Sequence, residues 1–202
     1  MDVERAIHKA VLALYFFLVP IMLTACAEQP DRPERAQKDG APEETTPTVH
    51  VQQPGKPPEG VKSFEVGPGG VHTENDVDYE QSPPVGGEHN PVWQNCGFYD
   101  KPVADENAVH SLEHGAVWIT YGTALPRDQI DQLRALTQGH THLLVSPHPD
   151  LDSPIVASAW GKQLVLEEAD DPDLERFVRA YSQGPQTPEP GAPCSGGIGR
   201  PG

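Results

Sequence analysis

The chain has few basic residues, and this scarcity excludes one class of partner. It contains 14 Lys and Arg residues against 30 Asp and Glu residues, which gives a formal net charge of −16 at pH 7. A protein this acidic repels nucleic acid and anionic lipid headgroups and attracts cations. We therefore expect no nucleic-acid partner.

Methionine is absent after the N-terminal segment, because both methionines, Met1 and Met22, lie within the first 25 residues. A thioether-rich copper(I) site is thereby excluded from the remainder, which leaves histidine, carboxylate and cysteine as ligands. The three cysteines form no Cys-x-x-Cys pair of the zinc-ribbon kind. A glycine-rich phosphate loop and a Gly-x-Ser-x-Gly nucleophile motif are also missing.

Only one long apolar run is present, and it predicts a secretory signal. Residues 11–25 follow the basic residues Arg5 and Lys9 and are interrupted by Pro20. The run is shorter than the roughly 20 residues that cross a bilayer, and its length is that of a signal-peptide core. An uncleaved anchor and an ordinary signal peptide remain alternatives.

The end of this run, Leu-Thr-Ala-Cys, resembles the lipobox of bacterial lipoproteins. The resemblance implies cleavage of residues 1–25 and a diacylglycerol thioether on Cys26, and two acyl chains suffice for stable anchoring. Residues 26–60, rich in Pro, Glu, Gln and Thr, then form a disordered tether. The expected location is extracytoplasmic, with the protein anchored to the cell membrane by lipid.

Residues 61–183 are expected to form a single α+β domain, with a small, mostly antiparallel sheet and two to three helices packed on one face. Asp171 and Pro172 favour the start of the last helix, Gly184 its end, and Gly161 a break within a hairpin. Residues 67–102 show no periodicity and form a long ordered loop region. The expected elements are strands at 61–66, 116–121 and 142–146, a hairpin of 154–160 and 162–167, and helices at 105–114, 126–138 and 171–184.

The helix expected at 105–114, with Asp105 as its N-cap, carries the motif His-x-x-Glu-His, the order found in inverted zinc hydrolases. His110 and His114 are one turn apart and therefore share one side of the helix, opposite Leu112. Glu113 lies between the two sides. This spacing suits two ligands of one metal ion.

Three interpretations of this motif are open. The histidines could be structural residues of a polar face, and the protein an accessory subunit with an envelope partner. They could bind copper or zinc without catalysis if the long loop folds over the helix, with His89 or His72 completing the site and Glu113 as a ligand or an orienting residue. Glu113 could instead be the general base of a zinc hydrolase. Enzymatic activity is not the favoured interpretation.

The cysteines after Cys26 are Cys96 and Cys194, and an exported pair most simply forms one disulfide. Metal binding by the thiolates is the alternative. The disulfide would fasten residues 184–202, a Pro- and Gly-rich tail, to the domain. It would close a loop of about 98 residues.

Several motifs together resemble a bacterial family catalogued as domain of unknown function 3105. They are "YEQSPPVGGEHNPVWQNCGFYDKPV", "NAVHSLEHGAVWITY", "ASAWG" and "GPQTPEPGAPC". The resemblance covers about residues 61–199 and implies an exported, membrane-linked protein of actinobacterial type. Members are often found beside predicted copper-handling proteins, which implies a metal by association. The matching positions are His89, Cys96, His110, Glu113, His114, Trp160 and Cys194.

Overall fold

The computed structural model describes residues 55–149 and 151–202. The predicted signal peptide at 1–25, the lipidation site Cys26 and most of the predicted tether lie outside these residues. Within the described part of the chain, no helix is both long enough and apolar enough to cross a membrane.

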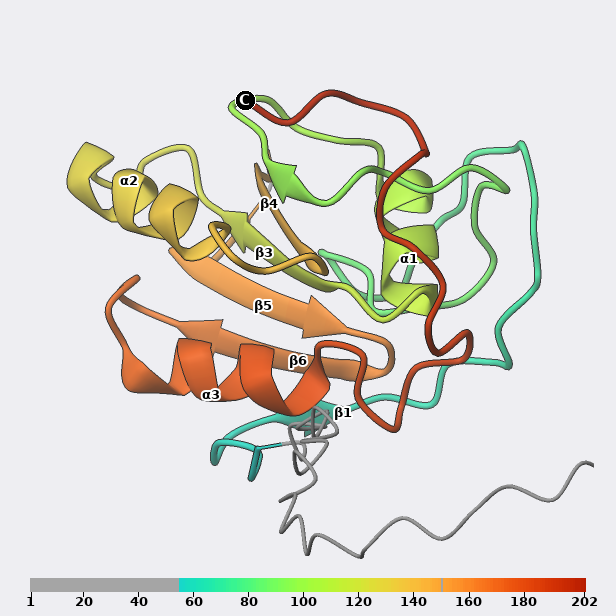
Figure 1. The fold of residues 1–202 in the computed structure, drawn as a ribbon, viewed down its shortest axis with the longest axis horizontal. Helices are drawn as coiled ribbons and strands as arrows, with labels where there is room; N and C mark the ends of the chain where they lie inside the picture. Colours follow the sequence, from blue (N-terminus) through green and yellow to red (C-terminus); the bar gives the residue numbers. More distant parts are fainter. Residues whose placement is uncertain (1–54, 150) are drawn as a thin grey trace, which may run out of the picture. The chain divides into compact units, whose positions relative to one another are not determined.

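Six strands of the described chain form one mixed sheet in the order β1–β6–β5–β3–β4–β2 (Figure 1). Neighbours β1–β6, β6–β5 and β5–β3 are antiparallel, whereas β3 and β2 run parallel to β4. The predicted α+β class is therefore confirmed. The strands are β1 (Lys62–Ser63), β2 (Gly97–Phe98), β3 (Val117–Tyr121), β4 (Leu143–Pro147), β5 (Ile155–Ala159) and β6 (Lys162–Leu166), and the helices are α1 (Asp105–Glu113), α2 (Arg127–Leu136) and α3 (Pro172–Tyr181).

The three helices are divided between the two faces of the sheet. Ile119 of β3 points into a core that contains Leu133 of α2 and Phe177 of α3, so these two helices share one face. The next side chain back along β3, Trp118, points to the other face, where it packs with Leu112 of α1. The alternation of a strand thus separates α1, which carries the histidine motif, from the main core.

The hairpin and the last helix begin as their local signals predict. Gly161 joins β5 to β6 with a φ of +66°, a conformation that favours glycine. The Asp171 side chain accepts a hydrogen bond from Asp173 N at the start of α3. Helix α3 ends at Tyr181, however, before the predicted end at Gly184. The reason is tertiary, because Gln183 N donates to the carbonyl of Gly115.

Two further expectations are corrected by contacts distant in sequence. The strand predicted at 61–66 is only β1, because its partner β6 begins at Lys162, and the next pair in register, Phe64 N to Gly161 O, already falls on the turn residue Gly161. Asp105 is not the N-cap of α1, since Ala104 occupies that position without a side-chain cap. The Asp105 carboxylate lies 3.5 Å from Nε2 of His148 instead.

The long loop and the C-terminal tail cover α1. Asn90 N and Gln94 N donate to carbonyls of α1 from the loop side, and Glu189 N donates to the carbonyl of Glu113 from the tail side. The loop contains β2, which periodicity missed because a two-residue strand is specified only by its pairing with β4. As a result, every residue of α1 from Asn107 to Glu113 is buried.

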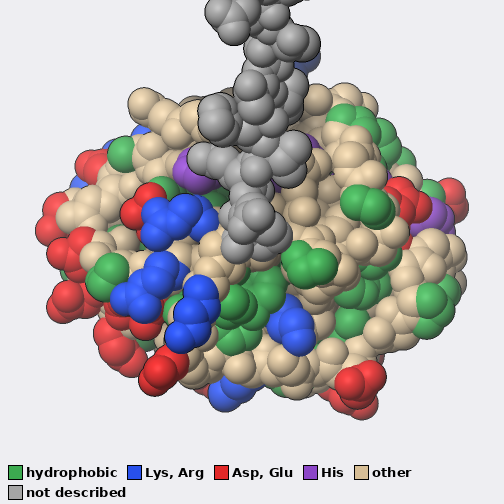
Figure 2. Space-filling model, turned by 60° about the horizontal axis from the view of Figure 1, so that its bottom comes forward, with side chains coloured by type: hydrophobic (Ala, Val, Ile, Leu, Met, Phe, Trp, Pro, Cys, Tyr) green, Lys and Arg blue, Asp and Glu red, His purple; other side chains and the backbone are tan. Residues whose placement is uncertain are grey.

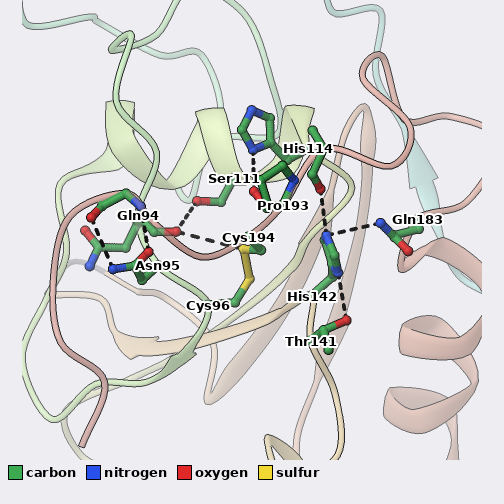
Figure 3. The surroundings of a disulfide bond; sticks show 12 residues. Gln94, Asn95, Cys96, Ser111, His114, Thr141, His142, Gln183, Pro193 and Cys194 are labelled. Atoms are coloured by element: carbon green, nitrogen blue, oxygen red, sulfur yellow. Dashed lines mark hydrogen bonds between the residues drawn. A yellow bond between two sulfur atoms is a disulfide. The ribbon is translucent and has the colours of Figure 1, made fainter.

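A disulfide between Cys96 and Cys194 joins the loop to the tail, with an S–S distance of 1.98 Å. Figure 3 shows that Pro193, the neighbour of Cys194, contacts His114 beside this bond. The predicted pairing of the two cysteines is therefore present, and the tail is fastened next to the end of α1.

The surface charge is more mixed than the net charge of the chain indicates. Figure 2 shows Lys and Arg side chains gathered among Asp and Glu side chains on the face turned forward. On α3, Arg176 lies 3.0 Å from Asp173 and Arg179 pairs with Glu175. Exposed pairs of this kind contribute little to stability, so we assign them no further role.

Candidate metal centre

Four side chains converge at the buried helix α1. Each offers one ligand atom, and these atoms all lie within 4.8 Å of one another. Helix α1 supplies two of the four side chains, and the long loop supplies the other two from opposite ends of its glycine-rich part. The members of this cluster, called here the His₃Glu cluster, are His72, His89, His110 and Glu113.

The cluster contains some of the predicted site residues but not all of them. His89, expected to be the third ligand, is fully buried within it, and Glu113 is a member too. His114 is not a member, although its Nε2 lies 3.0 Å from Nε2 of His110. His72, considered only if the loop covered the helix, joins the cluster through a bridge between its backbone and that of His89.

Backbone carbonyls accept hydrogen bonds from the Nδ1 atoms of three histidines. A carbonyl oxygen can only accept, so each of these Nδ1 atoms carries a proton, and a ring that is neutral then has an unprotonated Nε2 available to a metal ion. This arrangement is the one that orients metal-binding imidazoles in proteins. The bonds are His89 Nδ1 to Gly87 O at 2.7 Å, His110 Nδ1 to Asn90 O at 2.6 Å and His114 Nδ1 to Pro193 O at 2.8 Å.

Glu113 is the centre of the cluster. Its Oε2 lies 3.0 Å from Nε2 of His89, 3.6 Å from Nε2 of His72 and 3.8 Å from Nε2 of His110. Its Oε1 accepts a hydrogen bond from Gly70 N. Three ring nitrogens therefore face one carboxylate oxygen in a site from which most solvent is excluded.

The protonation states of two members suit a cation. Burial by itself would raise the pKa of Glu113, but the hydrogen bond from Gly70 and the neighbouring His89 outweigh it and lower that pKa below its ordinary value. Burial lowers the pKa of His110 to about 4, against the opposing effect of its bond to Asn90. At neutral pH the cluster therefore combines a carboxylate with a neutral imidazole, as metal binding requires.

A glycine brings the loop onto Glu113. A Cβ added at Gly69 would clash with the Glu113 carboxylate and with the side chain of Pro188, so only glycine permits this approach. The next residue, Gly70, has a φ of +79° and directs its N–H to the carboxylate. Sequence periodicity gives no sign of this contact, because it joins residues 43 positions apart.

His114 lies beside the cluster rather than in it. Its Nε2 is 3.5 Å from the carboxylate of Glu189, which is half exposed, and its ring packs against Trp93 at 4.8 Å between centroids. Its Nδ1 is held by the residue next to the disulfide, as Figure 3 shows. The tail therefore positions His114, the second histidine of the motif, whereas the loop positions His110, the first.

Comparison with known proteins places the chain in a family but gives no activity. The model of the family described as "Protein of unknown function (DUF3105)" matches residues 71–196, and the chain belongs to this family. Neither a curated protein nor a solved structure matches the chain significantly. The matched range contains all four members of the His₃Glu cluster and both cysteines of the disulfide.

Proposed function

We propose that this protein is an extracytoplasmic, lipid-anchored protein whose domain binds one divalent metal ion, copper(II) or zinc, in the His₃Glu cluster. The observation that carries the proposal is the convergence of ring nitrogens on the Glu113 carboxylate. The membrane anchor rests on the sequence before residue 55. An envelope protein partner remains a prediction.

A cation accounts for a contact that is otherwise unfavourable. Because Nδ1 of His89 donates to a carbonyl, a neutral His89 ring would present a lone pair to the Glu113 carboxylate at 3.0 Å. Two acceptors this close repel each other unless a proton or a metal ion lies between them. Both groups are fully buried, so water cannot relieve the repulsion from outside.

The chemistry of the donors selects the class of metal. The cluster offers imidazole nitrogens and a carboxylate and no sulfur, a set that suits copper(II) and zinc rather than copper(I). The only cysteines in the described chain, Cys96 and Cys194, are joined to each other. Thiolate binding is therefore not part of the proposal.

A hydrolase is less well supported by the geometry. A general base must have a free carboxylate oxygen to take a proton from a metal-bound water. Both oxygens of Glu113 are engaged, one by Gly70 and the other by His89. His114, which the inverted zinc-hydrolase motif would use as a ligand, lies outside the cluster.

Metal content tests the proposal. The full chain is expressed without a histidine tag, extracted in mild detergent, loaded with copper(II) or zinc and analysed for metal per chain. We expect about one ion in the parent and none in His89→Ala/His110→Ala. The matched control His140→Ala changes a histidine outside the cluster and should keep the ion. A parent chain without metal after loading would disprove the proposal.

A further inference from the structure

We infer that His72 is the exchangeable ligand of this site, and that a small external nitrogen or oxygen donor enters the coordination sphere of the metal at its position. The inference rests on the proposed function and deepens it. It separates the four members of the His₃Glu cluster into a fixed set, formed by His89, His110 and Glu113, and one replaceable member.

The first argument concerns how each ring is held. His89 and His110 each donate Nδ1–H to a backbone carbonyl, and Glu113 accepts from Gly70 N. Among the described residues, no hydrogen bond is made to the ring of His72. Its Nε2 lies 3.6 Å from the Glu113 carboxylate, beyond hydrogen-bond length. Nothing orients this imidazole except its contacts with the other rings.

The second argument concerns solvent. The His72 side chain is 38% exposed, whereas those of His89, His110 and Glu113 are 0%, 6% and 0% exposed. An external molecule can therefore reach the cluster at His72 without opening the fold. The buried members are accessible only after the loop or the tail has moved.

The third argument concerns what has to move. The backbone on each side of His72 is fixed, because Thr73 N donates to His89 O and His89 N donates to Val71 O. The His72 ring stacks on that of His110, at 4.9 Å between centroids and 14° between planes, and meets the ring of His89 edge-on at 4.9 Å. Rotation about the side-chain bonds is therefore enough to withdraw the ring, and exposed side chains make such rotations within nanoseconds.

The exchange conserves charge and electrons. The bond between the metal and Nε2 of His72 breaks, and a bond between the metal and the donor forms. A neutral imidazole replaces a neutral imidazole, or an anion such as azide binds and adds its own charge. Three protein ligands and one open position remain, the number that sites open to external ligands use.

Azide and imidazole are the probes for this position. The full chain is loaded with copper(II), and the parent and His72→Ala are titrated with each probe by electron paramagnetic resonance and visible absorption. We expect His72→Ala to keep its copper, with one nitrogen ligand fewer, and to bind azide about tenfold or more tightly than the parent, because no side chain competes. Imidazole should restore the parent spectrum.

A buried ligand provides the contrast. His89→Ala should lose copper and should not recover the parent spectrum with imidazole, and a urea unfolding curve for each variant shows whether it is folded. Equal azide affinities in the parent and His72→Ala would overturn the inference, as would complete loss of copper from a folded His72→Ala. If the parent itself takes up no copper, the proposed function fails, which is a different result.

Discussion

The Nε2 atoms of His110 and His114 lie 3.0 Å apart, and both rings donate their Nδ1 protons to backbone carbonyls. One-turn spacing on α1 produces this proximity, as the motif predicts. The ring of His110 nevertheless lies against Glu113 of the same helix and His89 of the loop, while the ring of His114 faces Glu189 of the tail. His110 is therefore a member of the His₃Glu cluster, whereas His114 lies beside it.

This division predicts that His114 is dispensable for metal binding. We expect His114→Ala to retain about one metal ion per chain after loading, because its Nε2 is not among the converging ligand atoms. His110→Ala should lose the ion, since it removes a member of the His₃Glu cluster. Metal analysis of the two variants side by side tests this, and loss of the ion from both would place His114 among the ligands.

A second prediction concerns the glycine that lets the loop approach Glu113. Gly69→Ala should weaken metal binding about tenfold or more, the lower end of the effect of removing an orienting partner, because the added Cβ would push the loop from the carboxylate. Gly67→Ala is the matched control, since a Cβ there meets nothing within 4 Å. Competition with a chromogenic chelator measures both affinities. Equal values for the two variants would contradict the role of this contact.

The low pKa of His110 predicts how the metal-free protein responds to acid. An unfolded histidine gains its proton near pH 6.5, whereas burial delays protonation of His110 in the fold until about pH 4. The unfolded state therefore binds more protons between these values, and the stability of the fold falls as the pH falls through this window. The loss reaches about 3 kcal/mol at most.

Urea unfolding at pH 7 and pH 4.5 measures this loss. His110→Gln, which cannot gain the proton, should lose less stability between the two pH values than the parent loses. An identical loss in both proteins would show that other groups cause the acid sensitivity.

The disulfide gives a prediction about stability. Cys96 and Cys194 are separated by 98 residues, and the bond restricts the unfolded chain over that distance. Cys96→Ser/Cys194→Ser should lower the free energy of unfolding by about 2–5 kcal/mol. Urea unfolding without reductant compares it with the parent. Because reduction removes the same bond, the parent with reductant should match the variant, and an unchanged parent would contradict the assignment.

Local signals in the sequence were sufficient to predict the helices and strands of the main core. Asp171 and Pro172 start α3 where the pattern predicts, and Leu133 of α2 faces inward as expected. Gly161 turns the hairpin. Capping, turn formation and apolar periodicity act between residues only a few positions apart, so they can be recognised without knowledge of the fold.

The candidate site needed the tertiary structure, because its loop members meet Glu113 across 24 residues of sequence from His89 and 41 residues from His72. The motif placed His110 and Glu113 on α1, and the missing methionines left histidine, carboxylate and cysteine as donors, of which the disulfide between Cys96 and Cys194 removes the cysteines. Only the loop and the tail, folding over α1, decided that His72 and His89 join these residues and that His114 does not. The physical reason is that the loop has no repeating pattern, so its position depends on the backbone and glycine contacts it makes with the helix.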